Sequence, residues 1–184
     1  MSYYNNYYIR RAAVKHRVFI SFYHHDDQWY KDYIDKHFYK LIINESVMNG
    51  EYDPDDSDEY IKRLIREEKI TSTSVVIVLV GPNTKHRKHV DWEIYAGLRA
   101  SINGRAGLAG ILLPEILTSD GKYCSSDLPP RLNDNVRSGY AKVYSWDYAI
   151  NHFTQVINTA FDDRLLLADK ADNSRPQMKI NTGH

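Results

Sequence analysis

The distribution of apolar residues along the chain predicts short strands that alternate with amphipathic helices. Residues 75–80 are apolar without exception, which is typical of a strand buried on both faces of a parallel sheet. Four more runs rich in aliphatic and aromatic residues predict strands at residues 17–22, 42–47, 108–113 and 141–144. Apolar side chains at helical spacing predict helices that begin near Asp27, at Ser57, just before Val90 and near Phe153.

This order of elements predicts an α/β fold of the doubly wound type. Right-handed crossovers then give a flavodoxin-like three-layer sandwich with a five-stranded parallel sheet. We expect one domain over residues 16–168, preceded by a tyrosine-rich and basic arm at residues 1–15. Residues 114–139 are mostly polar and predict a loop, and the polar residues 169–184 predict a disordered tail.

Composition narrows the classes of partner. The 24 basic and 24 acidic side chains cancel, so no overall field attracts nucleic acid or an acidic membrane, and we expect neither as a partner. No apolar run is long enough to span a bilayer, and the N-terminus lacks the apolar core of a signal peptide. These features predict a cytoplasmic protein. A single cysteine, Cys124, excludes a disulfide within the chain.

Several common catalytic motifs are absent from the sequence. Residues 22–25, which follow the first strand, contain no glycine, so neither a dinucleotide-binding fingerprint nor a P-loop is present. There is no His-Glu-x-x-His stretch and no Gly-x-Ser-x-Gly elbow. The third strand ends in Val80-Gly81-Pro82 and lacks the phosphorylatable aspartate of a receiver domain. The histidines do not predict a metal site, and we expect none.

One carboxylate, Glu93, stands near the start of the helix that follows the most apolar strand. Ligands of open α/β sheets bind at the carboxyl ends of the strands, where this segment is expected to lie. His89 precedes it by one turn, and Gly97 follows it by one turn and leaves room beside it. The opposite lip is expected from residues at the ends of the first two strands: Phe22, Tyr23, His24, Asp26 and Ser46. A plain alternative is that Glu93 only interacts with the helix dipole.

A carboxylate that faces aromatic and polar side chains suits cleavage at an anomeric carbon. The transition state of such a reaction is oxocarbenium-like, and a nearby carboxylate stabilises its positive charge. Arg87 and Lys88 precede Glu93 in a basic loop, and basic side chains of this kind bind diphosphates.

Two segments resemble a known family. Residues 18–22, Val-Phe-Ile-Ser-Phe, resemble the first strand of TIR domains. Residues 89–93, His-Val-Asp-Trp-Glu, resemble the Trp-x-x-x-Glu stretch that carries the catalytic glutamate of NAD-consuming TIR domains. The variant Val-Asp-Trp-Glu-Ile is similar to the TIR-like ThsB family of the bacterial Thoeris anti-phage system, over roughly residues 16–165. The sequence departs from the motif at His89, which stands where the family has a packing tryptophan.

The resemblance implies that NAD is a substrate and not a permanently bound cofactor. It implies cleavage of the nicotinamide–ribose bond with Glu93 as the catalytic residue. The product would be a cyclic ADP-ribose isomer or a related ADP-ribose signal that activates a separate effector protein. By position, Phe22, Tyr23, His24, Asp26, Ser46 and His89 are expected to bind the substrate.

Two other functions fit the same residues. One is a non-catalytic TIR-like module for binding or assembly, in which Glu93 is tied up by other groups. The other is an enzyme similar to nucleoside deoxyribosyltransferases, which also cleave an N-glycosidic bond. The tyrosine-rich arm and the clusters of charge favour self-association under each hypothesis.

Overall fold

The structure is a computed structural model that describes residues 15–44, 58–65, 70, 72–100 and 104–183. Its sheet has five strands in the order β2-β1-β3-β4-β5, and all neighbouring strands are parallel. The strands are β1 (His16–Ser21), β2 (Ile42–Asn44), β3 (Val75–Val80), β4 (Gly107–Leu112) and β5 (Lys142–Ser145). The helices are α1 (His24–Phe38), α2 (Asp58–Leu64), α3 (Lys88–Leu98), α4 (Pro130–Ser138), α5 (Trp146–Asn151) and α6 (Phe153–Leu166).

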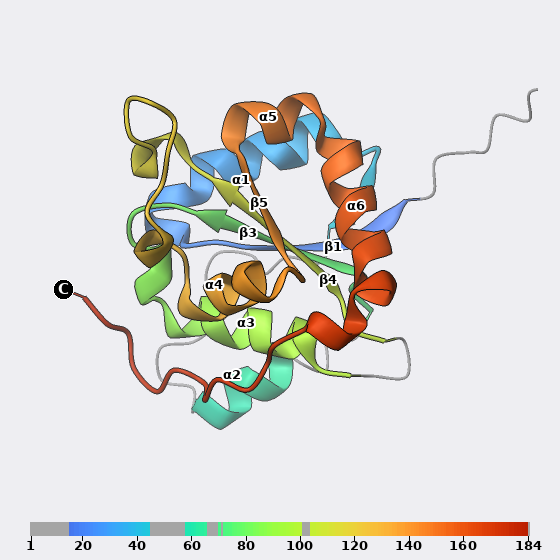
Figure 1. The fold of residues 1–184 in the computed structure, drawn as a ribbon, viewed down its shortest axis with the longest axis vertical. Helices are drawn as coiled ribbons and strands as arrows, with labels where there is room; N and C mark the ends of the chain where they lie inside the picture. Colours follow the sequence, from blue (N-terminus) through green and yellow to red (C-terminus); the bar gives the residue numbers. More distant parts are fainter. Residues whose placement is uncertain (1–14, 45–57, 66–69, 71, 101–103, 184) are drawn as a thin grey trace, which may run out of the picture.

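Helices cover both faces of the sheet, with α1, α5 and α6 on one side and α2, α3 and α4 on the other (Figure 1). Alternate residues of β3 divide between the two layers because successive side chains of a strand point to opposite faces. Val75, Ile77 and Leu79 pack with α1, α5 and α6. Val76, Val78 and Val80 pack with α2, α3 and α4. The predicted three-layer α/β sandwich is therefore confirmed.

The helix predicted from about Asp27 begins three residues earlier, at His24. Tyr23 is the N-cap residue of this helix, and its side chain makes no capping hydrogen bond. Asp27 lies inside the first turn, where its Oδ2 accepts a hydrogen bond from the Tyr23 backbone at 3.4 Å.

Residues 114–139, predicted as a loop, contain helix α4. This helix escapes a search for apolar periodicity because two of its three buried residues, Arg131 and Asn135, are polar. Its ends carry local signals, with a proline in the first turn and Gly139 at a φ of 82° after the last.

The structure also differs from the expectation of a disordered tail. Residues 171–183, here called the C-terminal strap, run along α4 and α3 (Figure 1). Composition predicted disorder because these residues bring little apolar surface. They are held instead by hydrogen bonds to buried polar groups of the domain, which a composition argument does not detect.

Other predictions lie outside the described residues: the arm before residue 15, the end of the second predicted strand and Ser57. Among the helices that the structure describes, none has both the length and the apolar character needed to cross a membrane.

Gly107 marks the closest approach between the sheet and a helix. A Cβ atom built on Gly107 would lie 1.9 Å from the backbone oxygen of Ala160 in α6. Gly107→Ala should therefore push α6 away from β4 and lower the free energy of unfolding by about 3 kcal/mol, near the upper end for overpacking. Chemical denaturation followed by circular dichroism measures this.

Gly121→Ala is the control, because a Cβ there would meet nothing within 4 Å and only the φ of 75° is unfavourable. Its expected cost is about 1 kcal/mol. Equal stability of the Gly107→Ala protein and the wild type would contradict the proposed packing constraint.

Candidate functional site

A cavity of about 210 Å³ lies between the end of β1 and the first half of α3. Its lining combines residues that are far apart in the sequence: Phe22, Tyr23, His24, Arg87, His89, Val90, Glu93 and Asn181. The cavity brings together most of the predicted site residues, namely Phe22, Tyr23, His24, His89 and Glu93. It adds Arg87, which the sequence suggested only as a diphosphate contact, and Asn181, which the sequence did not suggest.

Glu93 lies in the second turn of α3 and is 6% exposed. Since the influence of the helix dipole fades beyond the first turn, a dipole interaction does not account for a buried carboxylate here. Its Oε2 accepts a hydrogen bond of 2.6 Å from Ser21 Oγ, at the end of β1. This bond offsets part of the cost of burial and orients the carboxylate beside the cavity.

Ser21 is a site residue that the sequence analysis did not single out. Ser21 is a polar residue, yet it is completely buried and follows the apolar residues of β1. A hydroxyl at a buried strand position needs a hydrogen-bond partner, so a polar residue inside the apolar run 18–22 was the signal.

The expectation that Gly97 leaves room beside Glu93 was wrong. A Cβ on Gly97 would lie 2.7 Å from Val76 Cγ2. The glycine therefore allows α3 to pack closely against β3.

Two histidines that line the cavity favour the neutral form. Burial and the charge of Lys88 lower the pKa of His89 from 6.5 to about 4. Burial also lowers the pKa of His24, whose ring lies 4.2 Å from the Phe22 ring between centroids. His89 is therefore uncharged at pH 7 and adds no positive charge next to Glu93.

Positive charge near the cavity comes from Arg87. Its guanidinium lies 3.8 Å from the centroid of the Tyr23 ring, which is a cation–π distance. Arg87 Nε is buried and has no hydrogen-bond partner within the part of the chain that the structure describes. One wall of the cavity therefore combines an aromatic ring with a cation.

Two predicted residues do not line this cavity. Asp26 is exposed and accepts a hydrogen bond from Asn83 Nδ2 at 2.7 Å, away from the lining residues. Ser46 lies outside the described residues. Within the described ranges, no group of three or more His, Cys, Asp or Glu side chains is arranged to hold a metal ion.

The family model for "Thoeris protein ThsB, TIR-like domain" matches residues 19–115, more than half of the 184 residues. The chain belongs to this family. The match includes Ser21, Arg87 and Glu93 but ends well before the C-terminal strap. The resemblance inferred from residues 18–22 and 89–93 is confirmed.

Other comparisons add little. A search among curated proteins found no match. One similar solved structure is the TIR domains of the activated Roq1 resistosome, which directly recognizes the pathogen effector XopQ. It shares 14% identity with a TM-score of 0.40, and the alignment covers 86% of this chain and 81% of that one. A likeness at this level carries no argument about function.

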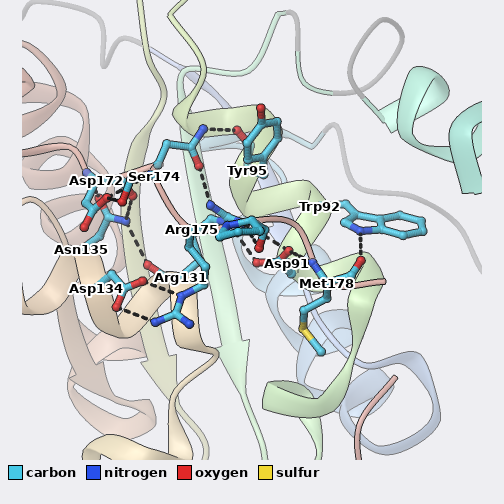
Figure 2. Close-up of polar contacts among 12 residues, drawn as sticks. Asp91, Trp92, Tyr95, Arg131, Asp134, Asn135, Asp172, Ser174, Arg175 and Met178 are labelled. Atoms are coloured by element: carbon cyan, nitrogen blue, oxygen red, sulfur yellow. Dashed lines mark hydrogen bonds and ion pairs between the residues drawn. The ribbon is translucent and has the colours of Figure 1, made fainter. Parts of the chain in front are cut away.

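A buried ion pair fixes the helix that carries Glu93. Arg131 Nε and Nη2 of α4 donate to the two carboxylate oxygens of Asp91 at 2.9 and 3.3 Å (Figure 2). Arg131 is 0% exposed and Asp91 2%. Asp91 and Glu93 stand two positions apart on α3, so they point in different directions. Asp91 serves the packing of α3, whereas Glu93 borders the cavity.

Asp27 is hydrogen-bonded to the backbone of Tyr23, a residue that lines the same cavity. Its Oδ2 accepts hydrogen bonds from Thr84 Oγ1 at 3.0 Å and from the Tyr23 backbone, which holds the loop after β3 against the start of α1. Burial raises the pKa of Asp27 from 3.8 to about 6.

The raised pKa of Asp27 predicts a dependence of stability on pH. The folded protein holds this proton more tightly than the unfolded chain does, so the free energy of unfolding contributed by Asp27 is greatest below pH 4. This contribution decreases as the pH rises from about 4 to about 6, by roughly 3 kcal/mol in total. Asp27→Asn removes the titration and should remove this decrease, as measured by urea denaturation at pH 4 and pH 7.

Asp26→Asn is the contrasting control. Hydrogen bonds from Asn83 and His25 lower the pKa of Asp26, so its contribution has the opposite sign and is present above pH 4. An Asp27→Asn profile that runs parallel to the wild type from pH 4 to pH 7 would contradict the raised pKa.

Proposed function

We propose that this ThsB-family protein cleaves the nicotinamide–ribose bond of NAD, with Glu93 as the catalytic residue. The product would be a cyclic ADP-ribose isomer or a related ADP-ribose signal, which diffuses to a separate effector protein in anti-phage defence. The observation that carries the proposal is a buried carboxylate, held by Ser21 at 2.6 Å, on the wall of a cavity lined by aromatic rings and Arg87.

The chemistry suits such a carboxylate. The bond between ribose C1′ and the nicotinamide nitrogen breaks, and its electron pair leaves with the nicotinamide, which becomes a neutral molecule. Positive charge develops on C1′ and its ring oxygen, where the Glu93 carboxylate stabilises it. A hydroxyl group, a ring nitrogen or water then attacks C1′. A proton lost by the attacking group is accepted by the carboxylate.

The neutral histidines support this assignment. A positive imidazolium next to Glu93 would oppose the developing positive charge on C1′. Because burial lowers the pKa of His89 to about 4, this ring stays neutral at physiological pH. The carboxylate then provides the nearest charge of the required sign.

The size of the cavity favours one end of the dinucleotide. Pockets that enclose a whole drug-sized ligand measure roughly 300–1,000 Å³, and this cavity measures about 210 Å³. Nicotinamide and its ribose would occupy it, with the flat ring beside Phe22 and Tyr23. The diphosphate would extend past Arg87.

The small volume also favours a second candidate, a TIR-like module that binds or assembles without catalysis. In that case NAD remains intact in the presence of the protein. A deoxyribosyltransferase-like activity is distinguished from NAD cleavage by supplying a deoxynucleoside and a free base. Only a deoxyribosyltransferase exchanges the base.

Mass spectrometry of NAD incubated with wild-type protein and with Glu93→Gln tests the proposal, in lysates of phage-infected cells that express each protein. The substituted glutamine still accepts the Ser21 hydrogen bond but carries no negative charge. We expect nicotinamide and an ADP-ribose product from the wild type and a loss of at least about 100-fold in Glu93→Gln.

Glu115→Gln is the matched control. Glu115 is exposed, accepts a hydrogen bond from the Tyr30 hydroxyl and does not line the cavity. The Glu115→Gln protein should retain turnover. Turnover that persists in Glu93→Gln would remove Glu93 from the catalytic role, and NAD that stays intact with every protein would favour the binding module.

We also propose that the protein self-associates. Trp29 on α1 is 62% exposed, and it lies beside Tyr33 and Trp146 in an aromatic cluster. Trp146 is only 6% exposed, so Trp29 is the side chain that presents this cluster to solvent, and tryptophan is enriched at protein interfaces. Light scattering should give a mass above that of one chain, and Trp29→Ser should lower it. A wild-type mass of one chain at all concentrations would exclude self-association.

A further inference from the structure

The end of the chain contributes to the cavity that contains Glu93. Asn181 lines this cavity with Arg87 and Glu93, although it lies far beyond residue 115, where the family match ends. The C-terminal strap, residues 171–183, therefore brings a side chain from outside the matched residues to a site whose other lining residues lie within them.

Buried groups anchor the base of the strap. Asp91 Oδ2 accepts a hydrogen bond from the Met178 backbone at 2.8 Å, and Trp92 Nε1 donates to the Met178 oxygen at 2.8 Å (Figure 2). Arg131 donates to the Pro176 oxygen at 3.3 Å and to Asn173 Oδ1 at 3.0 Å. Met178 is thus held against Asp91 and Trp92, the two residues of α3 that directly precede Glu93.

The tip of the strap is tied to the start of α3. Asn181 Oδ1 accepts a hydrogen bond from the Lys88 backbone at 2.9 Å, and the Thr182 backbone donates to the His86 oxygen at 3.0 Å. Asn181 thereby satisfies one of the backbone N–H groups that a helix start leaves open. The N-cap residue itself, Arg87, makes no such side-chain bond.

This bond fixes which way the Asn181 amide points. Its oxygen faces Lys88, so its NH₂ group is left to donate elsewhere. Asn181 is exposed, and within the described part of the chain its NH₂ group donates to no other residue, so it is open to solvent. Because Asn181 and Arg87 both line the cavity, an amide donor and a guanidinium stand at one site, and both favour an anionic acceptor.

We propose that Asn181 is a substrate-contacting residue whose side-chain NH₂ donates to a phosphate oxygen of the nucleotide. The identity of the nucleotide as NAD rests on the proposed function. The cavity accommodates only one end of such a ligand, so the phosphates lie past it, next to Arg87 and Asn181. The strap holds this donor in place through its anchored base.

Asn181→Asp in the Glu93→Gln protein is the sharpest test, because the substrate then binds without turnover. Aspartate still accepts the hydrogen bond from Lys88 and is favourable at a helix start, so the strap stays docked. It removes the NH₂ donor and repels a phosphate. Calorimetry should show NAD binding weakened about tenfold or more, with binding of nicotinamide riboside, which lacks phosphate, unchanged.

Gln155→Glu in the same background is the control. Gln155 is exposed on α6, in the opposite helix layer, and this change adds the same charge away from the cavity. NAD affinity should equal that of Glu93→Gln alone. A chain that ends at Met178 keeps the anchored base, lacks the tip, and should lose NAD affinity without losing affinity for nicotinamide riboside.

Three results would overturn the inference: unchanged NAD affinity in both strap variants, equal weakening for NAD and nicotinamide riboside, or no NAD binding by the Glu93→Gln protein. The first would leave Asn181 as a helix cap only. Turnover by the wild type separates the two proposals. If the wild type turns over NAD and the strap variants bind NAD with unchanged affinity, the Asn181 contact is excluded and the proposed enzymatic function stands. If NAD binding depends on Asn181 but the wild type shows no turnover, the Asn181 contact stands and the enzymatic function is excluded.

Discussion

The bidentate ion pair between Asp91 and Arg131 holds together the parts of this protein that surround the candidate site. It joins α3 to α4 and, through the Met178 backbone and the Pro176 oxygen, joins both helices to the C-terminal strap. Removing one partner of such a buried pair typically costs about 3–5 kcal/mol, since the other charge is left uncompensated. The position of Glu93 on α3 therefore depends on a contact made by its near neighbour in the sequence.

Three buried carboxylates near the carboxyl ends of β1 and β3 have three different environments. Asp91 faces a guanidinium, Asp27 accepts bonds from Thr84 and a backbone N–H, and Glu93 accepts a bond from Ser21. Among these carboxylates only Glu93 lines the cavity. The environments separate these carboxylates: Asp91 and Asp27 maintain the packing of the loops and helices, and Glu93 borders the cavity.

The cavity combines a family region with a segment outside it. Residues 19–115, which match the ThsB family, supply the carboxylate, its serine partner and the aromatic lip. The strap supplies Asn181 and closes the side next to the first turn of α3. A segment that is held on the surface by hydrogen bonds can change in sequence without repacking the core, so the side of the cavity next to α3 is independent of the packing of the sheet.

The sequence by itself determined the fold class, because an unbroken apolar run at residues 75–80 requires burial on both faces of a parallel sheet. It also indicated the family and singled out Glu93 as the candidate site carboxylate, because the residues of the motif around Glu93 are contiguous in the chain. Residues 22–24 and 89 were predicted to face Glu93 for a related reason: the carboxyl ends of parallel strands meet at one edge.

Only the tertiary structure decided what depends on partners far apart in the chain. Helix α4 was missed because two of its three buried side chains, Arg131 and Asn135, are polar, and their burial is explained only by Asp91 and Asp172. Ser21 gained a role from a glutamate in another element, and Asn181 from the start of α3. A polar side chain carries no periodic signal of its own burial. Its place is set by a hydrogen-bond partner that folding brings to it, and the local sequence does not name that partner.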